Sequence, residues 1–96
     1  MRVRGIRGAT QLEADSSAEM IDAVSQLLSE MLSANGVKTE DLISIILTST
    51  PDLTSEFPAV AARKIGLGSV PLLCAVEIDV KGSLPKVVRV LMHAHL

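Results

Sequence analysis

Apolar residues recur every three or four positions between residues 20 and 32, which is the spacing of one buried helix face. Ser16 and Glu19 precede this stretch at the spacing of a capping box, and Asn35 and Gly36 follow it as a left-handed stop. The pattern predicts a helix between Ser16 and Gly36 whose apolar stripe belongs to the core. The stripe consists of Met20, Ile21, Val24, Leu27, Leu28, Met31 and Leu32.

Other segments have the β-branched and apolar composition of strands. They span residues 2–9, 42–48, 70–77 and 86–96. A second, shorter helix is predicted to begin near Ser55, to hold Pro58 in its first turn, where the missing N–H is harmless, and to end before Gly66. Short turns are expected at residues 39–41 and 81–83.

The predicted elements follow the order β-α-β-α-β-β, which indicates an α+β fold with a mixed four-stranded sheet and the helices on one face. A length of 96 residues fits one domain, residues 1–96. Hydrophobic residues make up 48% of the chain, more than a monomer of this size can bury. We therefore expect part of the apolar surface, including the uncovered face of the sheet, to lie in a subunit interface.

Composition and charge exclude several classes of function. The longest apolar run, residues 70–76, is much shorter than the roughly 20 residues of a membrane span, and no signal peptide is recognisable, so we expect a cytoplasmic protein without a membrane partner. A net charge of −2 and a single aromatic residue, Phe57, argue against nucleic-acid binding. The single cysteine, Cys74, permits no internal disulfide and is expected to be a reduced, buried thiol.

Period-two counting along the last predicted strand separates two faces. One carries Val87, Arg89, Leu91, His93 and His95, and the other carries Val88, Val90, Met92 and Ala94. An arginine among aliphatic side chains needs a partner, and Glu77, at the end of an apolar strand, can supply one. Spacing alone favours a structural Arg89–Glu77 salt bridge.

Cys74 and the pair of His93 and His95 could each be a chemical site, but the sequence supports neither. Cys74 has no histidine placed to activate it, so covalent catalysis is not expected. His93 and His95 stand two apart on one strand face, but no other histidine or cysteine lies near them in the sequence, so no metal site is predicted.

Three stretches, taken in order and spacing, resemble the AroH-class chorismate mutases, the small monofunctional enzymes of the Bacillus type. They are Arg-Gly-Ile-Arg-Gly-Ala-Thr at residues 4–10, then Thr-Pro-Asp-Leu at 50–53 with Phe57-Pro58-Ala59 and Arg63, and finally residues 74–77 with Arg89. The resemblance runs from residue 3 to about residue 93. It implies a homotrimer with a pseudo-barrel arrangement and conversion of chorismate to prephenate in phenylalanine and tyrosine biosynthesis, without a cofactor.

The resemblance also implies roles for individual residues. The arginine matching Arg7 binds a substrate carboxylate, the glutamate matching Glu77 hydrogen-bonds the substrate hydroxyl, and the arginine matching Arg89 faces the ether oxygen that breaks. Phe57 and Arg63 would come from a neighbouring subunit. The implied substrate-binding set is Arg7, Leu73, Cys74, Ala75, Val76, Glu77, Arg89, Phe57, Ala59 and Arg63, and the implied catalytic residues are Arg7, Glu77 and Arg89.

Two other functions compete with this interpretation. One is a trimeric protein that binds a small carboxylate without catalysis, and the other is an imine or enamine deaminase of similar architecture. The opening motif, together with the segment from Phe57 to Arg63, favours the mutase over both. Chains of this class usually continue past the equivalent of Leu96 to a tail whose tyrosine and arginine cover the substrate. This sequence contains no tyrosine, and we expect a form without that tail to bind substrate more weakly while keeping the chemistry.

Overall fold

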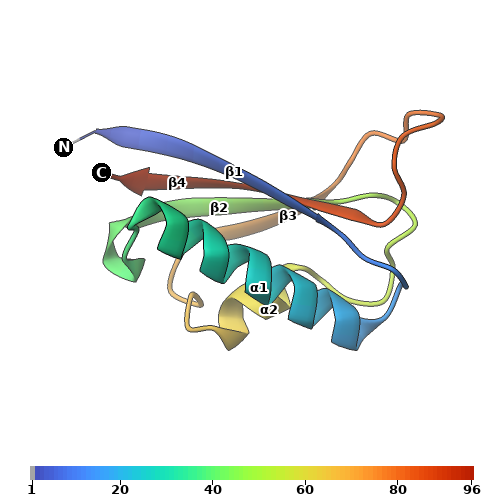
Figure 1. The fold of residues 1–96 in the computed structure, drawn as a ribbon, viewed down its shortest axis with the longest axis horizontal. Coiled ribbons are helices and arrows are strands. Elements are labelled where there is room, and N and C mark those ends of the chain that lie inside the picture. Colours follow the sequence, from blue (N-terminus) through green and yellow to red (C-terminus); the bar gives the residue numbers. More distant parts are fainter. Residues whose placement is uncertain (1) are drawn as a thin grey trace.

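The computed structural model of the chain describes residues 2–96. Its elements are β1 (Val3–Gln11), α1 (Ser17–Asn35), a 3₁₀ turn (Thr39–Asp41), β2 (Leu42–Ser49), α2 (Ala59–Lys64), β3 (Leu72–Val76) and β4 (Val87–His95). The predicted α+β order is confirmed, and both helices cover one face of the sheet (Figure 1). Within the described residues, no helix has the length and hydrophobicity to span a membrane.

The α1 helix begins and ends where the sequence predicts. The Ser16 hydroxyl accepts a hydrogen bond from the Glu19 N–H at 3.1 Å, and Gly36 ends the helix in the left-handed region with φ of 62°. In a capping box the Glu19 carboxylate would in turn accept from the backbone N–H of Ser16, but here it has other partners. The Glu19 carboxylate accepts from the backbone N–H groups of Glu13 and Ala14, so it fixes the chain that enters the helix.

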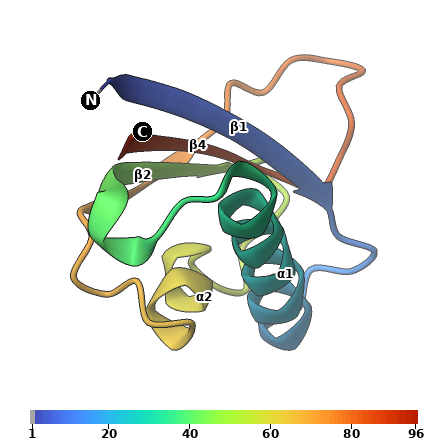
Figure 2. The same cartoon turned by 60° about the vertical axis from the view of Figure 1, so that its left-hand side comes forward.

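The sheet has the strand order β1-β4-β2-β3. β4 pairs antiparallel with β1 and with β2, whereas β2 and β3 are parallel. Figure 2 shows α1 and α2 side by side beneath this sheet. Four side chains of β4 face these helices and are at most 2% exposed, namely Val88, Val90, Met92 and Ala94. On the other face, Val87 at the start of the strand is also buried, at 4%. The two faces predicted for the last strand are therefore confirmed, and the face opposite the helices, called the open face below, carries Arg89.

The second helix begins later than the sequence predicts. α2 starts at Ala59, not near Ser55, with Pro58 immediately before it in a helical conformation. The backbone N–H groups of Thr54 and Ser55 both donate to the Asp15 carboxylate, which holds this segment as a loop. These hydrogen bonds to Asp15, which is far away in the sequence, explain why the helix starts later along the chain than predicted.

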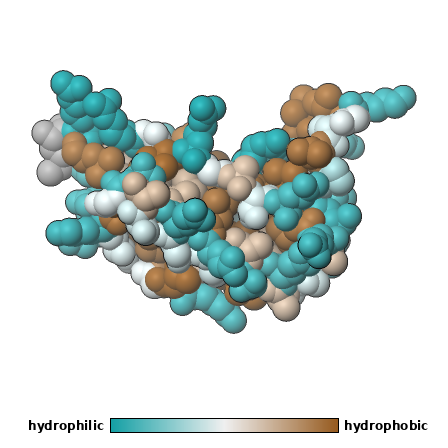
Figure 3. All heavy atoms as spheres, in the orientation of Figure 1, coloured by the Kyte–Doolittle hydropathy of each residue, from teal (hydrophilic) through white to brown (hydrophobic). Residues whose placement is uncertain are grey.

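The connection between β3 and β4 extends away from the rest of the molecule (Figure 1). Its apolar side chains are exposed, Ile78 at 85%, Leu84 at 63% and Val80 at 53%. Figure 3 shows apolar atoms gathered at this end of the surface.

Gly8 allows α1 to approach β1 closely. A Cβ atom at this position would lie 2.5 Å from the Met31 sulfur and 3.1 Å from a methyl of Leu27, whereas one at Gly5 would meet only a Leu91 methyl at 3.6 Å.

We expect Gly8→Ala to lower the free energy of unfolding by about 1–3 kcal/mol through overpacking. Gly5→Ala, on the open face of the same strand, is the matched control and should change it by about 0.5 kcal/mol or less. Urea unfolding compares the two, and equal stability would contradict the close contact at Gly8.

Candidate active site

Arg7 and Arg89 lie on the open face of the sheet on neighbouring strands. Arg7 is opposite Leu91 in the β1–β4 register, and Arg89 is opposite Ala9 on one side and Thr48 on the other. Directly opposed residues of antiparallel strands project from the same face, so both guanidinium groups stand on the side without helices. A broad open pocket of about 890 Å³ lies here and is lined by both arginines and by Glu77.

Glu77 directly follows β3, and its backbone holds it in place. Its N–H donates to the Ser49 carbonyl at 2.9 Å, which extends the pairing with β2 by one residue. One carboxylate oxygen accepts from the Thr48 hydroxyl at 3.0 Å, and the other forms an ion pair with Arg89. The ion pair predicted from spacing is therefore present. Thr48 was not anticipated from the sequence, although a hydroxyl within an apolar strand was a signal that could have identified it.

The ion pair leaves Arg89 accessible. Its side chain is 51% exposed, compared with 19% for that of Glu77. A guanidinium carries five N–H donors, and the pairing with Glu77 uses one of its terminal nitrogens. The remaining donors are free for an anionic or ether oxygen of a ligand, and Glu77 limits the orientations that the guanidinium can adopt.

A second pocket, of about 300 Å³, lies where the loop before α2 meets β3. We call this loop, residues 50–58, the Phe57 loop. Phe57 is 67% exposed here and Val76 is 72% exposed. Cys74 lines the same pocket and is only partly buried, which corrects the expectation of a buried thiol. The reason is that β3 is an edge strand of the sheet.

Strand alternation divides the predicted pocket segment, residues 73–76. Cys74 pairs with the buried Leu47, so its side chain projects to the helix side. Leu73 and Ala75 alternate with it and project to the open face, where Glu77 also lies. Cys74, Ala75 and Val76 all line the pocket beside Phe57, called the Phe57 pocket below, which contains neither Arg7 nor Arg89.

The remaining predicted residues belong to α2. Ala59 is 6% exposed and packs in the core of the chain, which leaves little of its side chain for a ligand. Arg63 lies in the last turn of α2, is exposed, and makes no ion pair within residues 2–96. The structure thus forms two clusters, one of charged residues on the open face and one around Phe57 beside the helix layer. Among residues 2–96, no group of three or more His, Cys, Asp or Glu side chains is placed to hold a metal ion.

The sequence model of the family described as chorismate mutase type I matches residues 3–96. The chain belongs to this family. It is a chorismate mutase by family, an isomerase, and the resemblance found from its motifs is confirmed.

Two curated relatives carry the name chorismate mutase AroH. The protein of Thermus thermophilus is 54% identical over 90 residues, which cover 93% of this chain and 74% of the relative. The protein of Bacillus subtilis strain 168 is 44% identical over 93 residues, covering 96% and 73%.

Solved structures agree with the fold. A chorismate mutase from Clostridium thermocellum superposes with a TM-score of 0.93 at 47% identity, over 95% of this chain and 81% of that one. A protein of unknown function of the Rid family from Yersinia pestis superposes with a TM-score of 0.62 at 16% identity, over 100% and 80%. At that identity the second match shows a shared fold alone.

Proposed function

We propose that this chain converts chorismate to prephenate, as a cytoplasmic enzyme of aromatic amino-acid biosynthesis, in clefts shared between the subunits of a homotrimer. One observation carries the proposal. In a member of the chorismate mutase family, Arg7 and Arg89 lie with Glu77 around one open pocket, which suits a small ligand with carboxylates and a hydroxyl.

The reaction needs a fixed positive charge more than it needs acid–base groups. Chorismate rearranges intramolecularly, and its C–O bond breaks ahead of C–C bond formation, so negative charge develops on the ether oxygen while no proton moves. Catalysis then consists of holding the reactive conformer and placing a cation beside that oxygen. No general base, nucleophile or cofactor is required by this chemistry.

Arg89 would supply the cation. Its planar fork can donate to the ether oxygen and to a carboxylate together, which a lysine cannot do. Glu77 orients the fork through the ion pair and is itself held by Thr48. A carboxylate has about four acceptor sites, so Glu77 can accept a further hydrogen bond from the substrate hydroxyl. Arg7, on the neighbouring strand, would bind a carboxylate.

The separation of the two clusters supports a shared site. In one subunit, Phe57 and Arg63 lie beside the helix layer, and Arg89 projects from the opposite face of the sheet. A ligand as small as chorismate does not bridge them through the sheet. A second copy that presents its Phe57 pocket to the open face would enclose the substrate and cover exposed apolar side chains such as Leu73 and Val76.

Replacing Arg89 should affect turnover far more than binding. We expect Arg89→Lys to lower kcat by about 10²–10³ and to change KM much less, because the charge it serves exists mainly in the transition state. The assay follows loss of chorismate absorbance together with prephenate formation. Arg4→Lys, on the same strand as Arg7 but exposed on its other face, is the matched control and should leave both constants unchanged. Turnover of Arg89→Lys close to the parent value would contradict the mechanism.

Thr48 should matter through its hydroxyl. Thr48→Val removes the donor to Glu77 at nearly constant volume, and we expect kcat/KM to fall about five- to tenfold, the equivalent of one lost hydrogen bond. Thr48→Ser retains the donor and should stay within about twofold of the parent on the same principle. Equal kinetics for the valine and serine variants would show that Thr48 does not orient Glu77.

Mixing two inactive variants should restore activity if sites are shared. In random heterotrimers of Arg63→Ala and Arg89→Ala chains mixed in equal amounts, about one quarter of the clefts would combine an intact Arg63 from one chain with an intact Arg89 from its neighbour. We expect recovery approaching that fraction after subunit exchange, and none in mixtures kept from exchanging. Light scattering should give a trimeric mass. A monomeric mass, or no recovery despite proven exchange, would refute the shared site.

A further inference from the structure

The Phe57 loop is tied to the segment that precedes α1. The Asp15 carboxylate accepts from the Thr54 N–H at 3.0 Å, from the Ser55 N–H at 3.1 Å and from the Thr54 hydroxyl at 2.9 Å. The Ser55 hydroxyl donates to the Asp15 carbonyl at 2.8 Å. One residue thus receives four hydrogen bonds from two consecutive loop residues, and we call this arrangement the Asp15 clasp.

The clasp acts on the part of the loop that forms the pocket. Thr54, Ser55 and Phe57 all line the pocket that also contains Cys74. Residues 50–58 contain neither helix nor strand, so hydrogen bonds and side-chain packing hold them. Asp15 itself is only partly buried and does not line the pocket, so its effect on the pocket must pass through Thr54 and Ser55.

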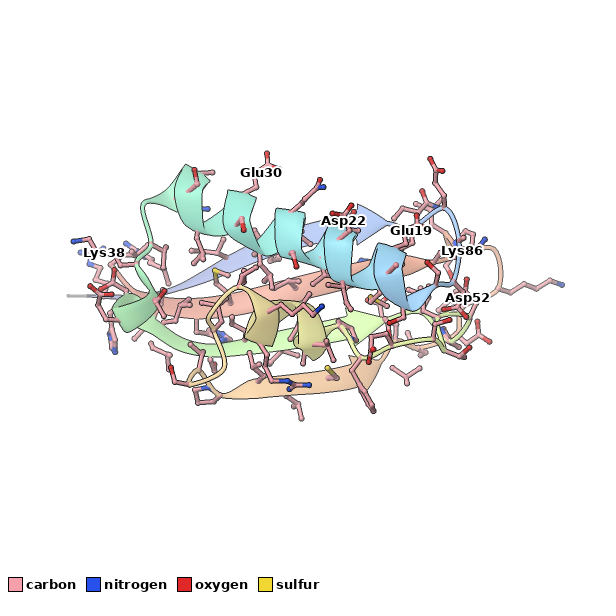
Figure 4. All side chains as sticks on the ribbon, turned by 90° about the horizontal axis from the view of Figure 1, so that it is seen from below. Glu19, Asp22, Glu30, Lys38, Asp52 and Lys86 are labelled. Carbon is pink, nitrogen blue, oxygen red and sulfur yellow. The ribbon has the colours of Figure 1, made fainter. Side chains whose placement is uncertain are left out.

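A second carboxylate extends the same attachment. One Glu56 oxygen accepts from the Ser17 hydroxyl at 3.0 Å, and the other accepts from the Phe57 N–H at 2.9 Å. The start of the loop is tied elsewhere, since the Asp52 carboxylate accepts from the Lys86 N–H at 2.9 Å. Figure 4 shows Asp52 and Lys86 together at the same end of the molecule as Glu19.

The Asp15 carboxylate is stabilised in its charged form. Desolvation raises the pKa of Asp15, but the hydrogen bonds from Ser55 and Thr54 outweigh it and hold the pKa below its ordinary value. Hydrogen bonds to an ionised acceptor are stronger than neutral ones, so the charge contributes to the clasp.

We propose that Asp15 is a positioning residue that holds the Phe57 loop against β3 and thereby sets the wall that this subunit contributes to a neighbour's cleft. The second part of this statement rests on the proposed function. Asp15 does not touch the substrate, and its role is confined to the position of Thr54 and Ser55.

Cys74 provides a readout that needs no activity. It is the only cysteine in the sequence, it is partly buried, and the Phe57 loop forms part of the pocket around it, so its rate of reaction with a thiol reagent reports how well the loop shields it. We expect Asp15→Ala to raise the labelling rate about tenfold, as loss of one to two net hydrogen bonds would. Asp15→Asn should give a smaller increase, because its side-chain oxygen can still accept from both N–H groups without the charge.

Asp22→Asn is the matched control. Asp22 is exposed on α1, away from the loop, and Figure 4 shows it on the helix surface. This variant should label at the parent rate. Urea unfolding and light scattering establish that each variant is folded and has the parent's mass. If Asp15→Ala does not fold, Asp15→Asn carries the comparison.

Kinetics test the second part of the proposal. A wall that contacts substrate equally in the ground and transition states affects KM, so Asp15→Ala should raise KM about tenfold while kcat stays within about twofold. In a double-mutant cycle, adding Thr54→Val to Asp15→Ala should cost less than Thr54→Val costs alone, because the two share one hydrogen bond.

The outcomes separate the clasp from the enzyme function. A parent labelling rate in folded Asp15→Ala would overturn the clasp, and so would a fall in kcat with labelling unchanged. Faster labelling with parent KM would overturn the link to the cleft. Faster labelling in a protein whose parent form does not convert chorismate would support the clasp and refute the proposed function.

Discussion

The one-sided packing of the sheet is the constraint on which the rest of this structure depends. Both helices lie on one face, so alternate residues of β4 must serve different purposes. Val88, Val90 and Met92 are almost completely buried beneath the helices, whereas Arg89 projects from the other face. A register shift of one residue would bury the guanidinium and expose the methionine, at a cost of several kcal/mol for an unpaired charge in the core. The register that builds the core therefore also delivers the cation to the open face.

The strength with which the Arg89 guanidinium acts on a bound ligand depends on what covers it. A half-exposed guanidinium acts through a high local dielectric, and its field on a ligand is weak. Glu77 restricts its orientation but also neutralises part of its charge, so in the proposed mechanism the pair alone would be a modest catalyst. Covering the open face with another subunit would remove water and strengthen the interaction with a developing negative charge. If the sites are shared, assembly would therefore contribute to catalysis in two ways, by lowering the local dielectric around Arg89 and by bringing residues of a second subunit to the site.

The parts predicted correctly from the sequence depend on local or periodic patterns. Ser16 and Gly36 delimit α1, and alternation along β4 separates core from open face, because each requires only neighbouring residues. The late start of α2 was not predictable in this way. It depends on Asp15 bonding to Thr54, 39 positions away in the sequence, which no local pattern encodes. The roles of individual site residues came from the family resemblance, and the separation of Cys74 and Val76 from the pocket of Arg7 and Arg89 became visible only in the structure.

The two clusters also differ in how they are held, and this separates their contributions. Arg89 belongs to a central strand and Glu77 extends an edge strand's backbone pairing, so the charged group is fixed by the ladder of the sheet itself. Phe57 belongs to a loop fixed by side-chain hydrogen bonds at the surface, which exchange with water more readily. In the proposed mechanism the charged group must be rigid, because preorganised charge lowers the barrier only if it does not reorganise during the reaction. An apolar wall has no such requirement, and a loop that opens to admit substrate and closes behind it is compatible with the same chemistry.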